Sequence, residues 1–164
     1  MLTKVAYSDE LLLSVFHVYM VYLRDRIMAS AQDRPIIVDS YYYKLWAKCV
    51  LLGFVNESIF SLWRSLPRPT YIIYLDIDPE LAWRRSSLGR ALNRMEYYGS
   101  TPSRHGFDKF QLELRDLMLK EVLGISCTRV EVSSDQQPTV EQVERLLVER
   151  RRLNRSEMRR ESGV

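Results

Sequence analysis

One stretch, residues 69–85, constrains the fold of this chain more than any other, and it reads PTYIIYLDIDPELAWRR. Residues 71–75 are a short apolar run of β-forming side chains, which predicts a strand buried on both faces, as in a parallel sheet. Asp78 then stands at the N-cap position of a helix, with Pro79 at the first helical position and Glu80 in the first turn. A strand that leads into a capped helix within so few residues is half of a βα unit.

The residues that follow this unit predict an anion site. In open α/β sheets, ligands bind at the carboxyl ends of the strands. The helix and loop after this strand carry the arginines Arg84, Arg85, Arg90 and Arg94. Guanidinium groups so close to a strand end are suited to binding phosphate.

The basic charge of the chain is concentrated at one end. The 164 residues carry a net charge of +3, and a length of this order predicts one domain. Residues 149–164 contain six arginines and three glutamates, and this difference of +3 equals the net charge of the whole chain. We therefore expect a near-neutral domain at residues 1–149 and a basic tail at 150–164, disordered or a frayed helix. A solvated end is the simpler interpretation of the tail, and a contact with nucleic acid or an acidic partner is the alternative.

Composition argues against several other classes. The two cysteines, Cys49 and Cys127, lie in apolar surroundings and predict reduced core thiols rather than a disulfide. Cysteines and histidines are scattered without the spacing of a zinc site, so no metal site is predicted. The most apolar stretch, residues 11–23, is too short to cross a bilayer, so we expect a cytoplasmic protein without a membrane partner.

Hydrophobic periodicity predicts alternating helices and strands. Ser8 caps a first helix that is apolar around most of its circumference, so we expect it to be largely enclosed. Residues 35–39 predict a strand, and helices are expected up to Gly53 and from Asn56 to about Ser65. After the helix that begins at Pro79, residues 86–106 lose their periodicity and predict a mobile lid. A helix at 107–123, a third strand at 128–132 and a last helix from Pro138 complete the pattern, which predicts an α/β fold with parallel strands.

The order and wording of these segments resemble the thymidylate kinase family of P-loop nucleoside monophosphate kinases. The likeness covers about residues 8–150 and is most specific at residues 74–80, which match Tyr-Leu-Asp-Val-Asp-Pro-Glu in the family almost letter for letter. Residues 10–13 match the start of a family helix, Glu-Leu-Leu-Leu. Residues 39–41 match Asp-Arg-Tyr in part, and residues 93–96 look like the Asp-Arg-x-Glu of the family's arginine-rich lid. The resemblance implies a three-layer parallel sheet with helices on both faces.

The chain also departs from the family's pattern. None of the six glycines is followed by lysine, so the Gly-x-x-x-x-Gly-Lys-Ser/Thr phosphate loop is absent, together with the first strands that the resemblance implies. The family's monophosphate-binding arginine on the long helix falls at Val18, and the arginine after the strand carboxylate falls at Ser40. We therefore expect a thymidylate-kinase-like fold that is incomplete or inactive as a kinase by itself.

The resemblance implies roles for particular residues. Arg85, Arg90 and Arg94 correspond to lid arginines that meet ATP and the transferring phosphoryl group, with Mg²⁺ as the accompanying metal. The acceptor side of the site is assigned to Asp39, Tyr41, Tyr42, Lys44 and Glu96. For all of these residues except Glu96 there is a structural alternative: Asp39 as a helix cap, the tyrosines as packing residues, Lys44 and the arginines as solvated surface charges.

Two other functions stay open at this point. The chain is either a non-catalytic module that binds a nucleotide or a partner, or a basic-tailed adaptor whose sheet is completed by another chain. The apolar strands at residues 36–38 and 71–75 have the composition of interior strands. At least one of them lacks the neighbour that this composition predicts, so self-association into a homodimer is expected as well.

Overall fold

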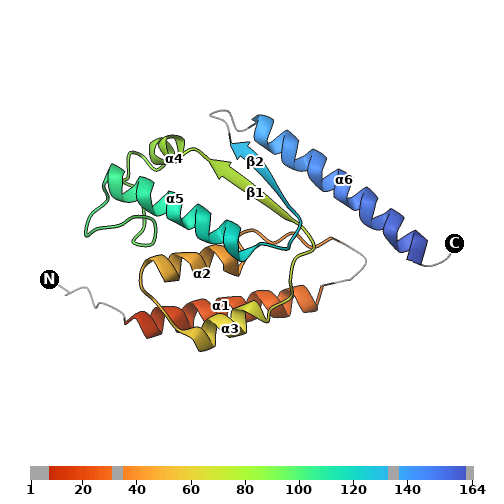
Figure 1. Cartoon of the computed structure of the whole chain (residues 1–164), viewed down its shortest axis with the longest axis horizontal. Coiled ribbons are helices and arrows are strands. Elements are labelled where there is room, and N and C mark those ends of the chain that lie inside the picture. The colour runs from red at the N-terminus through yellow and green to blue at the C-terminus, as the bar shows by residue number, and fades with distance from the viewer. Residues whose placement is uncertain (1–7, 31–34, 133–136, 162–164) are drawn as a thin grey trace.

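The structure, a computed structural model, describes residues 8–30, 35–132 and 137–161 and is a mixed α/β fold (Figure 1). Its described elements are, in chain order, α1 (Asp9–Met28), α2 (Tyr42–Leu51), α3 (Glu57–Arg64), β1 (Ile72–Ile77), α4 (Pro79–Arg85), α5 (Arg104–Glu121), β2 (Cys127–Val132) and α6 (Gln137–Glu161). The predicted α/β class is therefore confirmed. Helix α6 runs on through most of the residues assigned to the basic tail.

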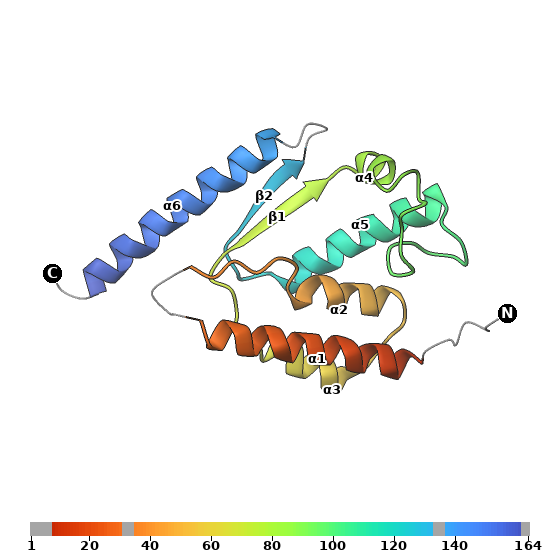
Figure 2. The same cartoon turned by 180° about the vertical axis from the view of Figure 1, so that it is seen from behind.

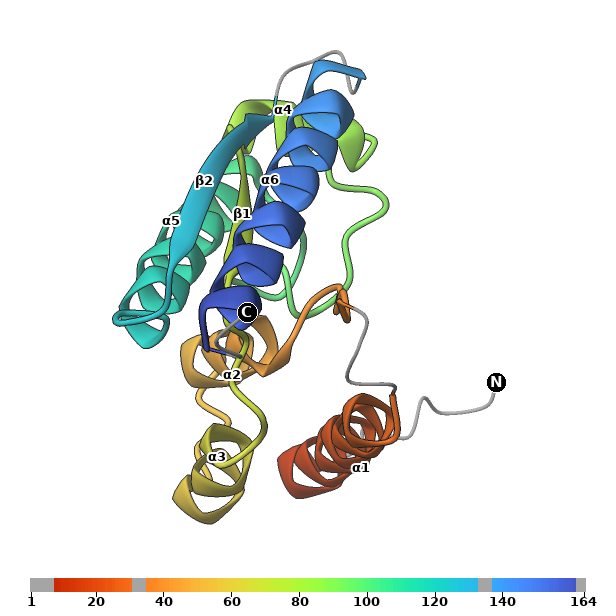
Figure 3. The same ribbon diagram turned by 90° about the vertical axis from the view of Figure 1, so that its right-hand side faces the viewer.

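The sheet of the described residues consists of two parallel strands, β1 and β2. The pairing runs in register from Ile72 opposite Cys127 to Ile77 opposite Val132. Helices lie on both faces of this pair, α5 on one side and α6 on the other (Figure 3). On the α5 face, Arg115 lies 3.7 Å from the carboxylate of Asp76. On the α6 face, the guanidinium of Arg150 lies 4.1 Å from the centre of the Tyr71 ring.

The prediction of a strand at residues 35–39 is wrong. Residues 35–38 are extended but form no ladder with any described strand, and Ile37 is 71% exposed. A β-strand needs a neighbour for its backbone groups, and an apolar run without one cannot form a sheet. The chain leaves this segment through Ser40, whose φ of 56° turns it into α2.

Strand β1 is also longer and less enclosed than predicted. Leu75 is 51% exposed, so the strand is not buried on both faces. Its end was expected before Asp76, yet Asp76 lies inside the strand and is only 9% exposed. A carboxylate is tolerated there because Arg115 and Arg129 both pair with it.

Helix α1 begins as predicted, because the Ser8 hydroxyl accepts a hydrogen bond from the backbone N–H of Leu11. The expectation that this helix is largely enclosed is wrong. It packs on α3 through one face that includes Leu13 and Met20 (Figure 2). The opposite face leaves five large apolar side chains exposed: Leu11, Val15, Val18, Tyr19 and Tyr22. An all-round apolar sequence indicates burial only where neighbours exist for every face.

An aromatic cluster forms the core between α1, α2 and α3. Trp63 and Phe60 of α3 are almost fully buried, with ring centres 5.6 Å apart. The Trp63 indole N–H donates to His17 Nδ1 at 3.3 Å, so the His17 ring takes part in the packing of this core. Asn56 caps α3 as predicted, accepting from the N–H of Ile59 at 3.1 Å.

Both cysteines are free thiols, but only one belongs to the core. Cys49 of α2 is completely buried, and this burial raises the pKa of its thiol to about 12. Cys127 opens β2 and is exposed, so the prediction of a core position is wrong for this residue. It is the first residue of β2, at the start of the parallel ladder.

The lid segment, defined as residues 86–106, extends into the first turn of α5. The helix begins at Arg104 rather than at Phe107, because the Ser103 hydroxyl accepts a hydrogen bond from the Gly106 N–H at 3.1 Å. The Gly106 carbonyl in turn accepts from the backbone N–H of Tyr98 at 3.2 Å. A side chain at position 106 would overlap the Tyr98 carbonyl oxygen, so glycine is required for this approach.

Replacing Gly106 by alanine should therefore destabilise the protein. The added methyl group must push the Tyr98 backbone away, and overpacking of this kind costs about 1–3 kcal/mol. Urea unfolding followed by circular dichroism measures the loss. Ser100→Ala, an exposed change in the same segment, is the control and should leave the midpoint unchanged. Equal midpoints for Gly106→Ala and the parent would contradict this account of the lid segment.

Candidate functional site

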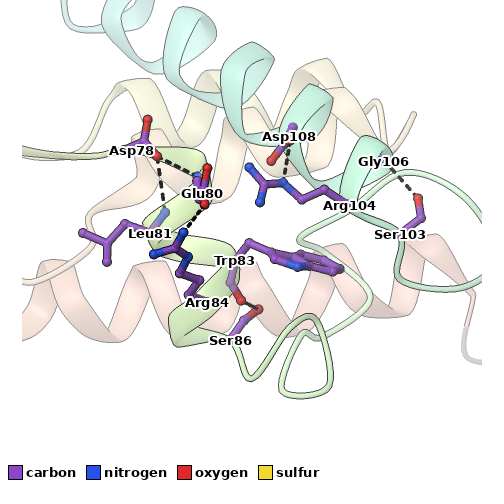
Figure 4. Close-up of polar contacts among 10 residues, drawn as sticks. All are labelled: Asp78, Glu80, Leu81, Trp83, Arg84, Ser86, Ser103, Arg104, Gly106 and Asp108. Atoms are coloured by element: carbon purple, nitrogen blue, oxygen red, sulfur yellow. Dashed lines mark hydrogen bonds and ion pairs between the residues drawn. The ribbon is translucent and has the colours of Figure 1, made fainter. Parts of the chain in front are cut away.

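The candidate site is built on the turn between β1 and α4 (Figure 4). Asp78 caps α4 as predicted, and its Oδ1 accepts hydrogen bonds from the N–H groups of Glu80 at 2.8 Å and Leu81 at 3.3 Å. Pro79 occupies the first helical position. On the outer face of α4, Arg84 pairs with Glu80 one turn earlier. The carboxyl end of β1 is thereby joined rigidly to a helix whose last turn is basic.

Trp83 connects α4 to the lid segment and to α5. Its ring lies 5.5 Å from that of Phe107 at the start of α5. Gly89 packs directly against the six-membered ring of the indole, where any side chain would overlap the ring. The Ser86 hydroxyl donates to the Trp83 carbonyl oxygen at 2.7 Å and accepts from the Gly89 N–H at 3.0 Å. The first turn of the lid segment is thus folded around one tryptophan.

The three predicted arginines lie in succession along this part of the chain. Arg85 ends α4, and Arg90 and Arg94 belong to the lid segment; all three are exposed. Arg94 also closes a turn, because its Nη1 donates to the carbonyl oxygen of Gly99 at 2.9 Å. The structure therefore places these cations on one continuous surface segment after the carboxyl end of β1.

Glu96, assigned to the acceptor side, holds the lid segment to α2. One carboxylate oxygen lies 3.5 Å from Lys48 Nζ, and the other accepts from the Asn93 N–H at 3.0 Å. The Lys48 side chain is only 13% exposed, and this desolvation lowers its pKa even though Glu96 opposes the effect. Lys44 lies one turn earlier on α2 and also lowers the Lys48 pKa by charge repulsion. Lys48 was not among the predicted residues.

The other acceptor-side residues surround the start of α2. Asp39 and Lys44 are exposed, whereas Tyr42 is 4% exposed and packs its ring 4.2 Å from that of Tyr43. Tyr41 is half-buried, and its hydroxyl donates to the Pro67 carbonyl oxygen at 2.9 Å. Burial raises the pKa of the Tyr41 hydroxyl to about 12, with a smaller contribution from Tyr43. These contacts place both tyrosines in packing positions, which is the structural alternative stated for them.

A second charged cluster was missed by the sequence reasoning. Asp76 of β1 pairs with Arg129 of β2 and with Arg115 of α5. Tyr74, which shares this face, has its pKa raised by burial and by the Asp76 charge. The cluster ties both strands to α5, and its carboxylate is fully engaged by the two guanidinium groups.

The described residues contain no group of three or more His, Cys, Asp or Glu side chains that could hold a metal ion. Within the same ranges, no helix is long and apolar enough to cross a membrane. The fold and the site together define a small mixed α/β protein in which arginines follow the strand-to-helix turn between β1 and α4. Comparison with protein-family models gives no match, and comparison with curated proteins finds no similar sequence.

The Lys48–Glu96 pair should contribute measurably to stability. Glu96→Gln keeps the acceptor for the Asn93 N–H but leaves a largely buried ammonium without its counter-charge, which costs about 2 kcal/mol. Lys48→Met, which removes the buried charge, should cost less. In a double-mutant cycle by urea unfolding, the two changes together should cost less than their sum by about 1 kcal/mol. Strict additivity would show that the two side chains do not interact in solution.

Proposed function

We propose that this chain is a thymidylate-kinase-like protein that binds nucleotide polyphosphates and does not transfer phosphoryl groups by itself. The observation that carries the proposal is the turn at residues 74–80, where the strand ends, Asp78 caps α4, and three exposed arginines follow. This turn contains the sequence block that most specifically resembles the kinase family. A non-catalytic nucleotide-binding module is thus favoured over a working kinase.

The chemistry of the arginines supports an anionic ligand. Each guanidinium presents donors in a planar fork that matches phosphate oxygens, and it stays charged at any physiological pH. Arg90 and Arg94 lie on the lid segment, and Arg85 precedes it on α4. A triphosphate chain carries several anionic oxygens in a row, so cations in succession along one segment can bind it at more than one point.

The absent phosphate loop argues against catalysis by this chain alone. In P-loop enzymes, backbone N–H groups and a lysine position the β- and γ-phosphates, and positioning supplies nearly all of the rate enhancement. The sequence has no Gly-Lys-Ser/Thr element. Arginines on an exposed segment can hold an anion, but they do not align an attacking oxygen with the γ-phosphate.

The described side chains do not fit a magnesium site of their own. Asp76 is neutralised by two arginines, and Asp39 is an exposed carboxylate that accepts a hydrogen bond from the Ser40 hydroxyl. Magnesium in nucleotide sites takes most of its ligands from phosphate oxygens and water. We therefore propose that any magnesium enters with ATP as part of the ligand.

The acceptor side of the proposed site has lost groups that would hold a monophosphate. The resemblance places the phosphate-binding arginine at Val18, which is 69% exposed on α1. Glu96 and Tyr42 are engaged in packing and ion pairing within the chain. Of the predicted acceptor residues, Asp39 and Lys44 keep exposed polar groups beside the start of α2 and would supply what remains of this subsite.

The purified 164-residue chain should show no turnover of ATP with any deoxynucleoside monophosphate. The physical reason is the missing phosphate loop. A coupled assay for ADP release measures the rate, with an intact nucleoside monophosphate kinase in parallel as the positive control. Turnover of about 1 per second that co-purifies with the chain would contradict the proposal.

The chain should nevertheless bind ATP or pyrophosphate through its arginines. In Arg85→Ala/Arg90→Ala/Arg94→Ala the affinity should fall at least ~10-fold, or ~1.4 kcal/mol, at low salt. Titration calorimetry measures the affinity. Binding by the parent should weaken as ionic strength rises, because exposed charges are screened.

A matched control separates a specific site from net charge. Arg24→Ala/Arg26→Ala/Arg145→Ala removes the same charge from exposed positions on α1 and α6. This control should bind the anions as the parent does. If the two triple variants lose the same affinity, the arginines of the lid segment form no site.

A further inference from the structure

Strand β1 has one edge without a partner among the described residues. β2 lies along one side of β1, and the described chain places no strand on the other side (Figure 3). The Ile72 N–H donates to the Ser126 carbonyl oxygen at 2.9 Å, which directs residues 72, 74 and 76 toward β2. In a parallel ladder alternate residues face alternate sides. The backbone groups of Ile73, Leu75 and Ile77 therefore face the free edge.

The free edge lacks several of the features that usually protect an edge strand, because β1 contains no lysine, proline or bulge. Natural edges are shielded by lysine, proline, a bulge or a very short strand. Residues 73, 75 and 77 are isoleucine, leucine and isoleucine, and Leu75 at the centre is 51% exposed. The one charge on the strand, Asp76, is neutralised by Arg115 and Arg129 of its own chain. No repulsion from this carboxylate opposes the approach of a second, identical edge.

We propose that β1 pairs with β1 of a second copy of this chain, antiparallel and centred on Leu75. In this register Leu75 lies opposite the partner's Leu75, and Ile73 lies opposite the partner's Ile77. In each pair, the backbone groups of both residues face the free edge of their own strand. The two residues of a pair therefore exchange two hydrogen bonds. The same strand is its own complement, as a two-fold interface requires.

The pairing produces one four-stranded sheet in the order β2-β1-β1-β2. A two-fold axis perpendicular to the sheet keeps equivalent faces together, so both α6 helices cover one face and both α5 helices the other. The exposed Leu75 side chains meet between the two α6 helices and cover each other. The paired strand is about 20 Å long, which is a small interface, so we expect a weak dimer with a Kd of ~10–100 µM.

Sedimentation velocity over a range from about 1 to 500 µM tests the proposal with the full chain. The mass should rise with concentration from 19.4 kDa toward twice that value. In hydrogen exchange, the amides of Ile73, Leu75 and Ile77 should gain protection as the dimer forms. The amides of residues 72, 74 and 76, already bonded to β2, should not change. A chain that stays monomeric over the whole concentration range would overturn the proposal. In that case only a different polypeptide could occupy the free edge.

Charge substitutions at the two-fold axis provide the decisive comparison. Leu75→Lys places two like charges opposite each other and should give a monomer with an unchanged melting temperature, because position 75 is half exposed. Leu75→Glu should behave in the same way, and mixing the two variants should restore a dimer of one copy of each. Val55→Lys, at a 64% exposed position between α2 and α3, should dimerise as the parent does.

The exposed face of α1 provides the competing route to a dimer. A dimer that survives Leu75→Lys but dissociates on Val18→Asp would assign the interface to α1 and would overturn the pairing of β1. Failure of the two charged variants to form a mixed dimer would overturn it as well. None of these outcomes depends on nucleotide binding, so the result is independent of the proposed function.

Discussion

Parallel pairing of β1 with β2 is the constraint on which the rest of this structure depends. Parallel strands cannot be joined by a tight turn, so the chain between them must cross back over the sheet. That return path consists of α4, the lid segment and α5, and it carries Arg85, Arg90 and Arg94 after the carboxyl end of β1. The Asp76 cluster then holds α5 against the sheet, because this one carboxylate forms ion pairs with Arg129 of β2 and Arg115 of α5.

Local signals predicted the helices well because each had its own start and stop chemistry. Ser8, Asn56 and Asp78 each cap the helix that the sequence assigned to them. Gly53 follows α2 with a φ of 78°, as a helix-terminating glycine does. Such signals act within a few residues, so they need no knowledge of the tertiary fold.

Features that depend on distant neighbours were harder to predict. Residues 35–39 have strand composition, but no described partner pairs with them. Asp76 looked like the end of a strand, because nothing local shows that arginines 39 and 53 residues further along the chain neutralise it. In the candidate site, the arginines were visible as a charged run, whereas Lys48 was not, since its role arises only when the lid segment brings Glu96 to α2.

The three tryptophans occupy different environments, so they can serve as intrinsic fluorescent probes of different parts of the molecule. Trp63 is fully buried in the aromatic core, and the Trp46 ring lies under the guanidinium of Arg64 at 5.1 Å. Trp83 instead contacts Gly89 of the lid segment and Phe107 of α5. Fluorescence from Trp83 alone, with the other two indoles replaced, would therefore follow the lid segment separately from the core.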